Sequence, residues 1–232
     1  MAGGNFDINQ AKVRPGSYMN FKAKKSYAPS VSSRGTVVVP LVGYDWGPDG
    51  EFIELDSDAP DAEIAKLGRS IYDDHELIRL VRLAFENATK VRVYIVAGGT
   101  KATVIKDDLT ITAKYAGKRG NDISLACTAN VDGGFDISLY LDGELVETFT
   151  GVNTVEDLKT KESQYVDFSG EGELTAFAGA ILEGGSGTEN TNSSFAVFLD
   201  AAEKVKCNTV LIPVSEESLV QAAASKVKYL RT

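Results

Sequence analysis

A run of four small residues is the segment whose composition and spacing come nearest to a ligand site. Gly184-Gly185-Ser186-Gly187 precedes a helical pattern, and such loops hold phosphate when backbone amides and the helix dipole face one anion. The run lacks the Gly-Lys-Ser/Thr ending of a nucleotide-binding loop, and Thr188 stands where a nucleophile-elbow motif requires glycine. A loop that joins two parts of the chain explains these residues with fewer assumptions.

The remaining reactive groups are scattered along the sequence. His75 is the single histidine, which excludes a site with two histidine ligands, and its place in Asp73-Asp74-His75-Glu76 predicts a solvated residue at a helix start. Four acidic residues could suggest calcium, namely Asp56, Asp58, Asp61 and Glu63. Leu67 replaces the glutamate that closes an EF-hand loop, so helix capping is the better explanation. We therefore predict no catalytic residue, no metal and no cofactor.

Two smaller features complete this survey. Lys118-Arg119-Gly120-Asn121-Asp122 predicts a tight turn whose basic pair contacts an acidic partner surface. Cys127 and Cys207 are too few for a disulfide scaffold in a chain of 232 residues, and we expect both to be buried free thiols.

Composition indicates an ordinary globular protein. Hydrophobic residues make up 43% and charged residues 25% of the chain, and the formal net charge is -9. No apolar run approaches the roughly 18 residues that span a bilayer, and the first ten residues lack the layout of a secretion signal. We expect a chain that is made and kept in the cytoplasm, without direct membrane insertion.

Alternating helical and apolar segments predict an α/β domain. The run 36–42 and the run 91–97 have the β-branched, continuously apolar character of strands that are covered on both faces. Short and longer helical patterns cover 61–67 and 74–88, and after residue 184 a helix, a strand at 209–213 and a helix at 216–230 follow. The last helix ends the sequence, so we expect this domain to be incomplete at its carboxyl terminus.

Between these parts the periodicity changes to that of short strands. Segments 109–115, 123–129, 135–141 and 144–149 are rich in β-formers, and Asp142-Gly143 is a two-residue hairpin signal. Thr154 to Asp157 resembles a capping box, and 165–168 suggests a further strand. We predict an open, mostly parallel α/β sheet with helices, interrupted by an inserted antiparallel β domain and preceded by an extended N-terminal arm.

The predicted boundaries follow from these changes. They give an N-terminal arm at 1–35, the first part of the α/β domain at 36–100, the inserted β-rich domain at 101–183 and the second α/β part at 184–232. The junctions are two glycine-rich stretches, represented by Gly98, Gly99, Gly184, Gly185 and Gly187.

The arm has the pattern of an extended strand. Side chains from Tyr18 to Lys24 alternate in character, with Met19 and Phe21 on one face. Basic residues dominate the arm while the whole chain is acidic, which suits contact between copies of the chain. A nucleic-acid tail is the alternative, but no run of five like charges occurs and an acidic body repels phosphate.

Several motifs resemble those of contractile tail sheath proteins from phages and phage-tail-like bacteriocins. The resemblance covers almost the whole chain and rests on the order and spacing of four stretches: Lys12-Val13-Arg14-Pro15-Gly16-Ser17-Tyr18, Arg34-Gly35-Thr36-Val37 with Trp46-Gly47-Pro48, Tyr115-Ala116-Gly117-Lys118-Arg119-Gly120-Asn121-Asp122, and Leu182-Glu183-Gly184-Gly185-Ser186-Gly187.

The resemblance implies a structural protein rather than an enzyme. Copies would stack as six-membered rings in a helical sheath around the tail tube, in contact with baseplate proteins, and contraction would drive the tube through a cell envelope during genome ejection. It implies that the arm is an inter-subunit strand, formed by Lys12, Val13, Arg14, Pro15, Gly16, Tyr18, Met19 and Phe21. The following stretch 26–34, with Pro29 and several serines, would absorb the rotation of the bodies it joins.

Two other classes of protein stay open at this point. An α/β enzyme with a β-rich lid would require a polar pocket with a perturbed acid or base near Gly184. A surface adhesin would use the β insertion to bind a receptor.

Overall fold

The structure is a computed structural model that describes residues 35–131, 133–187 and 192–229. The predicted arm strand therefore lies outside the described residues. The described chain is a mixed α/β protein with several sheets, as the sequence predicts, and most of its strand pairs are antiparallel.

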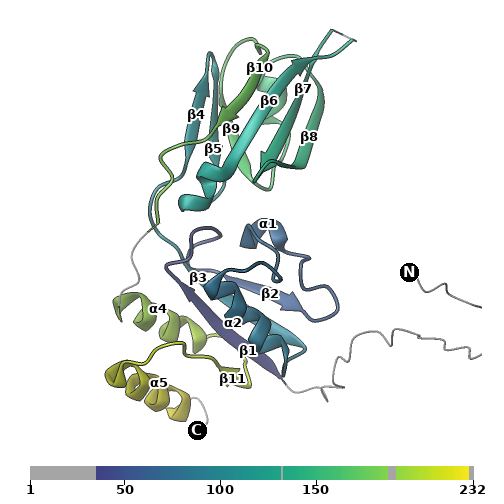
Figure 1. Cartoon of the computed structure of the whole chain (residues 1–232). Coiled ribbons are helices and arrows are strands. Elements are labelled where there is room, and N and C mark those ends of the chain that lie inside the picture. Colours follow the sequence, from purple (N-terminus) through teal and green to yellow (C-terminus); the bar gives the residue numbers. More distant parts are fainter. Residues whose placement is uncertain (1–34, 132, 188–191, 230–232) are drawn as a thin grey trace, which may run out of the picture.

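The described chain consists of an α/β unit and a β unit, which Figure 1 shows one above the other. The α/β unit contains β1 (Thr36–Val42), β2 (Phe52–Asp56), α1 (Ile64–Leu67), α2 (Glu76–Phe85), β3 (Lys90–Val96), α4 (Asn192–Ala202), β11 (Thr209–Val210) and α5 (Glu217–Tyr229). The β unit lies between β3 and α4 in sequence. It contains β4 (Thr103–Lys106), β5 (Leu109–Ala113), a 3₁₀ helix (Lys118–Asp122), β6 (Ile123–Ala129), β7 (Phe135–Leu141), β8 (Glu144–Val152), α3 (Val155–Lys159), β9 (Val166–Gly170) and β10 (Phe177–Ile181). The predicted boundaries at residues 35, 100 and 183 stay predictions.

The sheet of the α/β unit has the order β11-β1-β3-β2. β1 pairs in parallel with β3 along its whole length and with β11 at two positions, whereas β2 runs antiparallel to β3. Val39 and Leu41 of β1 join one buried cluster, while Val38 and Val42 join another. This alternation means that β1 is buried on both faces, which explains its unbroken apolar sequence.

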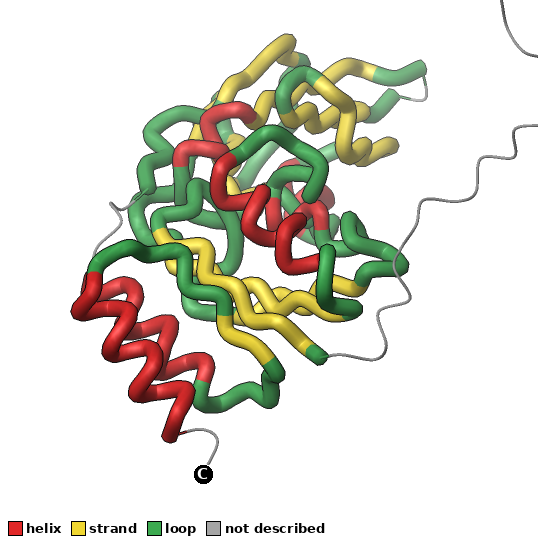
Figure 2. Tube along the Cα trace, turned by 60° about the horizontal axis from the view of Figure 1, so that its bottom comes forward, coloured by secondary structure: helices red, strands yellow, loops and turns green. Residues whose placement is uncertain are grey.

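Helices cover both faces of that sheet (Figures 1 and 2). α2 presents Ile78, Val81 and Ala84 to the larger cluster, while Leu77, with which the predicted stripe began, is partly buried against it. On the other face, Phe195 and Phe198 of α4 lie against β1 and β3, and α5 packs on α4.

The β unit contains two antiparallel sheets, of order β10-β6-β7-β8 and β4-β5-β9. β6 and β7 have the predicted bounds, and Asp142 and Gly143 form the turn between β7 and β8 with φ of 54° and 81°. Thr154 caps α3 with the predicted capping box, in which its side chain accepts from the Asp157 amide. One cluster of buried side chains extends through both units.

Two predicted elements need correction, and a third element, α5, is largely exposed. The strand predicted at 209–213 forms ladder pairs only at Thr209 and Val210, because β11 lies at the edge of the sheet and Pro213 has no N–H to donate. The helix predicted from Asp61 is limited to the single turn of α1. In α5 only Ala223 is buried, since that helix packs on α4 rather than on the sheet.

Strands β2, β4 and β10 were not predicted.

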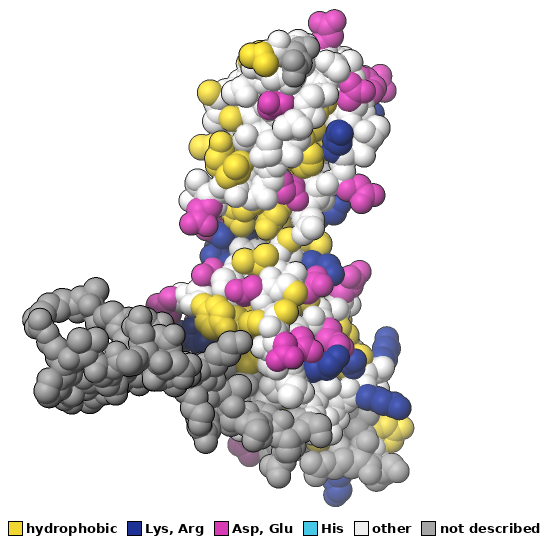
Figure 3. Space-filling model, turned by 90° about the vertical axis from the view of Figure 1, so that its right-hand side faces the viewer, with side chains coloured by type: hydrophobic (Ala, Val, Ile, Leu, Met, Phe, Trp, Pro, Cys, Tyr) yellow, Lys and Arg dark blue, Asp and Glu magenta, His cyan; other side chains and the backbone are white. Residues whose placement is uncertain are grey.

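Figure 3 shows acidic and basic side chains scattered over one face of both units. Among the described residues, no helix is long and apolar enough to cross a membrane.

Candidate functional site

The chain passes between the two units twice, and the two connections pair with each other. The amide of Thr100 donates to the Ser186 carbonyl at 2.9 Å, and the Ser186 amide donates back at 3.1 Å. Thr103 and Glu183 exchange amide bonds of 2.8 and 3.2 Å in the same way. The connections therefore form a short antiparallel ribbon rather than two independent linkers.

The predicted junction glycines lie along this ribbon, and two of them are needed for its close contacts. A Cβ on Gly99, whose φ is +97°, would lie 2.0 Å from the Ser186 carbonyl oxygen, and one on Gly185 would lie 2.5 Å from the Gly117 oxygen. Gly98 also has a positive φ of 59°, whereas a Cβ on Gly184 or Gly187 would meet nothing within 4 Å. The role of these five glycines as domain junctions stays a prediction.

Two of the loop amides that a phosphate would need, those of Gly185 and Ser186, already donate within the protein. The Gly185 amide donates to Oδ1 of Asn121 at 2.8 Å, and Nδ2 of Asn121 donates to the Gly185 carbonyl at 2.9 Å. The Thr100 hydroxyl donates to the Gly184 carbonyl at 2.7 Å. These bonds favour the joining-loop interpretation of Gly184 to Gly187 over an anion site.

Trp46 lies where the two units meet. It is fully buried, its indole N–H donates to the Ala65 carbonyl at 2.8 Å, and its ring meets the edge of Tyr115 at 5.3 Å between centroids. Tyr115 belongs to the β unit, so this aromatic pair joins the units. The sequence signal was the single tryptophan in a Gly/Pro-rich loop, but nothing in the sequence indicated its partner.

Polar groups surround the loop before Trp46. The buried Tyr44 hydroxyl donates to the Leu67 carbonyl at 2.7 Å, and the Tyr44 ring meets the edge of His75 at 5.4 Å. Nη2 of Arg69 forms an ion pair with Oδ2 of Asp45 at 2.5 Å. Burial raises the pKa of Tyr44 above its ordinary value, so the hydroxyl remains a donor.

His75 is not the solvated residue that the sequence predicted, because its ring packs on Tyr44 and is half-buried. Burial lowers its pKa below the ordinary 6.5; the charge of Asp45 opposes this shift and that of Arg69 adds to it. Within the part of the chain that the structure describes, three buried polar atoms lack a hydrogen-bond partner: Asp45 Oδ1, Arg69 Nε and His75 Nδ1.

The predicted role of the basic pair is wrong for Arg119. This side chain is buried and is held by Asp122 and Asp142 of its own chain, so it cannot face a partner. Lys118 is exposed.

The acidic cluster neither caps α1 nor forms a metal site. Glu63, at the N-cap position, makes no capping bond with its side chain. Asp61 instead accepts from the Ser70 hydroxyl at 2.8 Å and from the Ile71 amide at 2.9 Å, which ties the loop after α1 to the segment before it. In the described ranges, no three His, Cys, Asp or Glu residues lie together as a metal site.

Both cysteines are free thiols, as predicted. Cys127 is buried in β6, whereas Cys207 is only half-buried. Burial raises the pKa of each thiol.

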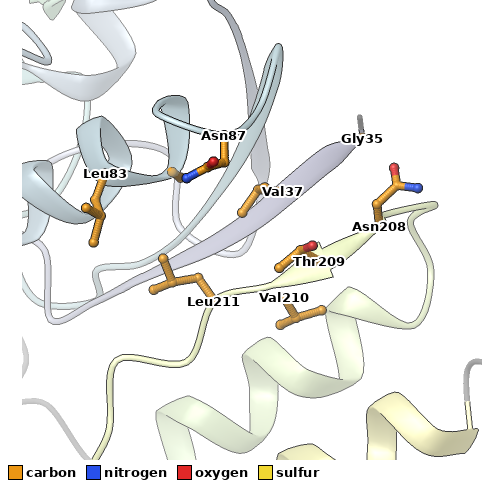
Figure 4. Close-up of a pocket in the computed structure, with 9 residues that line it drawn as sticks. Gly35, Val37, Leu83, Asn87, Asn208, Thr209, Val210 and Leu211 are labelled. Carbon is orange, nitrogen blue, oxygen red and sulfur yellow. The ribbon is translucent and has the colours of Figure 1, made fainter. Parts of the chain in front are cut away.

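A hollow of about 580 Å³ lies beside the edge strand β11. Figure 4 shows Leu83 of α2 and Asn87, just after that helix, across from Val37 of β1 and from Leu211 just after β11. Its lining is mainly apolar and contains no acid or base, so it lacks the chemistry of an active site.

Comparison with known proteins identifies relatives of both units. The family model of the phage tail sheath protein β-sandwich domain matches residues 97–191. Two proteins of Bacillus subtilis strain 168, the uncharacterized protein YqbK and the phage-like element PBSX protein XkdK, are each 34% identical over an alignment of 253 residues. Each alignment covers 100% of this chain and 53% of the relative, so the chain spans about half the length of these relatives.

Two solved structures are similar over most of the chain. The sheath tail protein of Desulfitobacterium hafniense is 35% identical with a TM-score of 0.76, covering 93% of this chain and 50% of its own. The sheath tail protein of Listeria innocua is 32% identical with a TM-score of 0.75, covering 86% and 45%. The family and both structures are tail sheath proteins, not enzymes, in agreement with the predicted structural class. Residues 97–191 thus match the β-sandwich domain of phage tail sheath proteins, and the chain is similar to sheath tail proteins over most of its length.

Proposed function

We propose that this chain is a structural subunit of a contractile tail sheath, which polymerises around an inner tube and shortens to drive the tube through a cell envelope. The similarity to sheath tail proteins over 93% of the chain is the observation that carries the proposal. The partners would be further copies in six-membered rings, the tail tube and the baseplate.

The sheet of the α/β unit supports assembly by strand addition. Its order leaves one side of β11 and one side of β2 without a strand partner among the described residues. Free backbone N–H and C=O groups at such an edge accept an extended segment from another chain. Beside β11, an added strand would also cover Val37, Leu83 and Leu211 in the hollow.

The arm supplies a segment suited to such an edge. Its period-two sequence from Tyr18 to Lys24 fits one strand with an apolar and a polar face. We propose that this strand joins the sheet of a neighbouring copy and that backbone pairing keeps the copies linked while their bodies rotate. The inserted β domain and the two α/β parts would then rotate together as the body of one subunit.

Removal of the arm tests this proposal. We expect that deletion of Met1 to Lys25 leaves a folded body, with the circular dichroism spectrum and unfolding transition expected for residues 36–229. In sedimentation velocity it should stay monomeric and fail to enter polymers of the intact chain. Incorporation of the deleted chain as efficient as that of the intact chain would refute the proposed role of the arm.

A proline substitution separates backbone pairing from charge. Asn20→Pro removes one N–H within the predicted strand, whereas Asn20→Ala retains it. We expect the proline variant to raise the concentration needed for polymerisation and the alanine variant to behave like the natural chain. Equal polymerisation of both variants would show that the arm does not pair as a strand.

A further inference from the structure

The two residue pairs of the ribbon do not by themselves fix the β unit on the α/β unit. The ribbon contains several glycines with positive φ, and such a connection bends easily. The shared buried cluster and the Trp46–Tyr115 pair hold the units together, and the buried Arg119 of the 3₁₀ helix adds directional polar contacts between them.

Arg119 is 5% exposed, and its guanidinium uses donors in three directions. Nη1 meets Oδ2 of Asp122 at 3.0 Å and Nη2 meets Oδ2 of Asp142 at 2.5 Å, both within the β unit. Nε donates across to the Gly68 carbonyl of the α/β unit at 3.1 Å. The two carboxylates thus orient the planar guanidinium, and its Nε–H group bonds to the α/β unit.

The backbone next to this side chain crosses the same boundary. The Arg119 amide donates to the Asp45 carbonyl at 3.2 Å. Gly117 approaches that carbonyl so closely that a Cβ on it would lie 1.9 Å from the oxygen. Side chain and backbone therefore fix the β unit at two separate carbonyls.

The acceptor on the α/β side is itself held firmly. Gly68 ends α1 in the left-handed conformation, and its amide donates to the Ile64 carbonyl at 2.7 Å. Its Cα packs against Trp46, since a Cβ there would lie 2.6 Å from the indole ring. The Gly68 carbonyl therefore lies at the end of a helical turn that packs on Trp46.

The neighbouring cavity does not offer a different role for this arginine. A space of about 310 Å³ is lined by Arg69 and Arg119 together with Asp73, Asp142 and Glu144. The guanidinium faces two carboxylates already, and three acidic residues line the space, so an anion would find no net positive charge there.

We propose that Arg119 is the positioning residue that locks the β unit onto the α/β unit and makes the described chain one rigid body. The proposal concerns the isolated chain and goes beyond sheath assembly. In a contracting sheath, this contact would transmit force between the two units, and that consequence rests on the proposed function.

Two probes in the whole chain test the lock. Spin labels at Leu83→Cys in α2 and Thr148→Cys in β8 report the distance between the units, in a chain with Cys207→Ser; Cys127 is buried and is retained. Trp46 is the only tryptophan, so its emission reports whether the boundary opens.

We expect Arg119→Met to widen the distance distribution and to shift Trp46 emission to the red, with greater quenching by acrylamide. Arg119→Lys keeps the charge but cannot bond all three acceptors, so we expect an intermediate width. Arg92→Met is the matched control, because Arg92 binds Glu54 at 2.8 Å and the Lys206 carbonyl within the α/β unit alone. It should leave the distribution narrow.

A narrow distribution with a buried Trp46 in Arg119→Met would overturn the proposal, as would equal widening in Arg92→Met. If Arg119→Met does not fold, Asp142→Asn provides the test, since it removes one of the two carboxylates that orient the guanidinium and keeps Arg119 itself. A distance distribution in that variant as narrow as that of the natural chain would then refute the proposed role of Arg119. Because both readouts use unpolymerised chains, they do not depend on whether the chain forms a sheath.

Discussion

At the scale of single residues, His75 makes the stability of the fold depend on pH. Its ring is half-buried against Tyr44, and burial lowers its pKa below 6.5. The unfolded chain therefore binds a proton at His75 more readily than the folded chain does. The contribution to stability is complete above the unfolded pKa and is lost as the pH falls from about 6.5 through the folded pKa.

We predict that His75→Phe, which keeps a ring against Tyr44, removes this loss. The difference in free energy of unfolding between the variant and the natural chain should shift in favour of the variant between about pH 7 and about pH 5. Urea unfolding across this range measures it. Tyr72→Phe, at a ring that is 66% exposed, is the control and should show no such change. A constant difference for His75→Phe would contradict the assigned environment.

The sequence predicted little of the chemistry of individual residues at the boundary. Local pattern placed Lys118 and Arg119 in a turn, which is where they lie. It could not show that Arg119 is buried, because its acceptor Gly68 lies 51 positions away in the sequence. The same limit applies to the contact of Trp46 with Tyr115.

At the scale of elements, prediction succeeded where a pattern repeats over several residues. β6 and β7 alternate in character throughout, and α2 carries a clear apolar stripe. β4 spans only four residues and β10 has the weak sequence Phe-Ala-Gly-Ala-Ile, so neither gives a local signal. These strands depend on partners elsewhere in the chain, namely β5 and β6.

The ribbon between the units allows a matched test at this scale. Gly99→Ala places a Cβ against the Ser186 carbonyl at a φ of +97°, whereas Gly184→Ala places one in open space at a φ of +81°. We predict that Gly99→Ala lowers the free energy of unfolding by at least about 2 kcal/mol. Gly184→Ala should lower it by about 1 kcal/mol, from backbone strain alone. Urea unfolding measures both. Equal losses would mean that the two connections do not approach as described.

At the scale of the whole molecule, the two units share a buried cluster and a polar boundary, and the chain spans about half of its relatives' length. The mixed α/β class follows from the alternation of helical and apolar segments in the sequence. The relative placement of the units does not, since it depends on carbonyls and side chains that meet only after folding.

A sheath subunit should assemble with further copies of itself. Electron microscopy of the purified chain at increasing concentration tests this assembly most directly, and it also separates the sheath from an enzyme or an adhesin. We predict six-membered rings or striated tubes from the intact chain. Isolated particles without rings or tubes at every concentration would contradict the proposed assembly into a sheath.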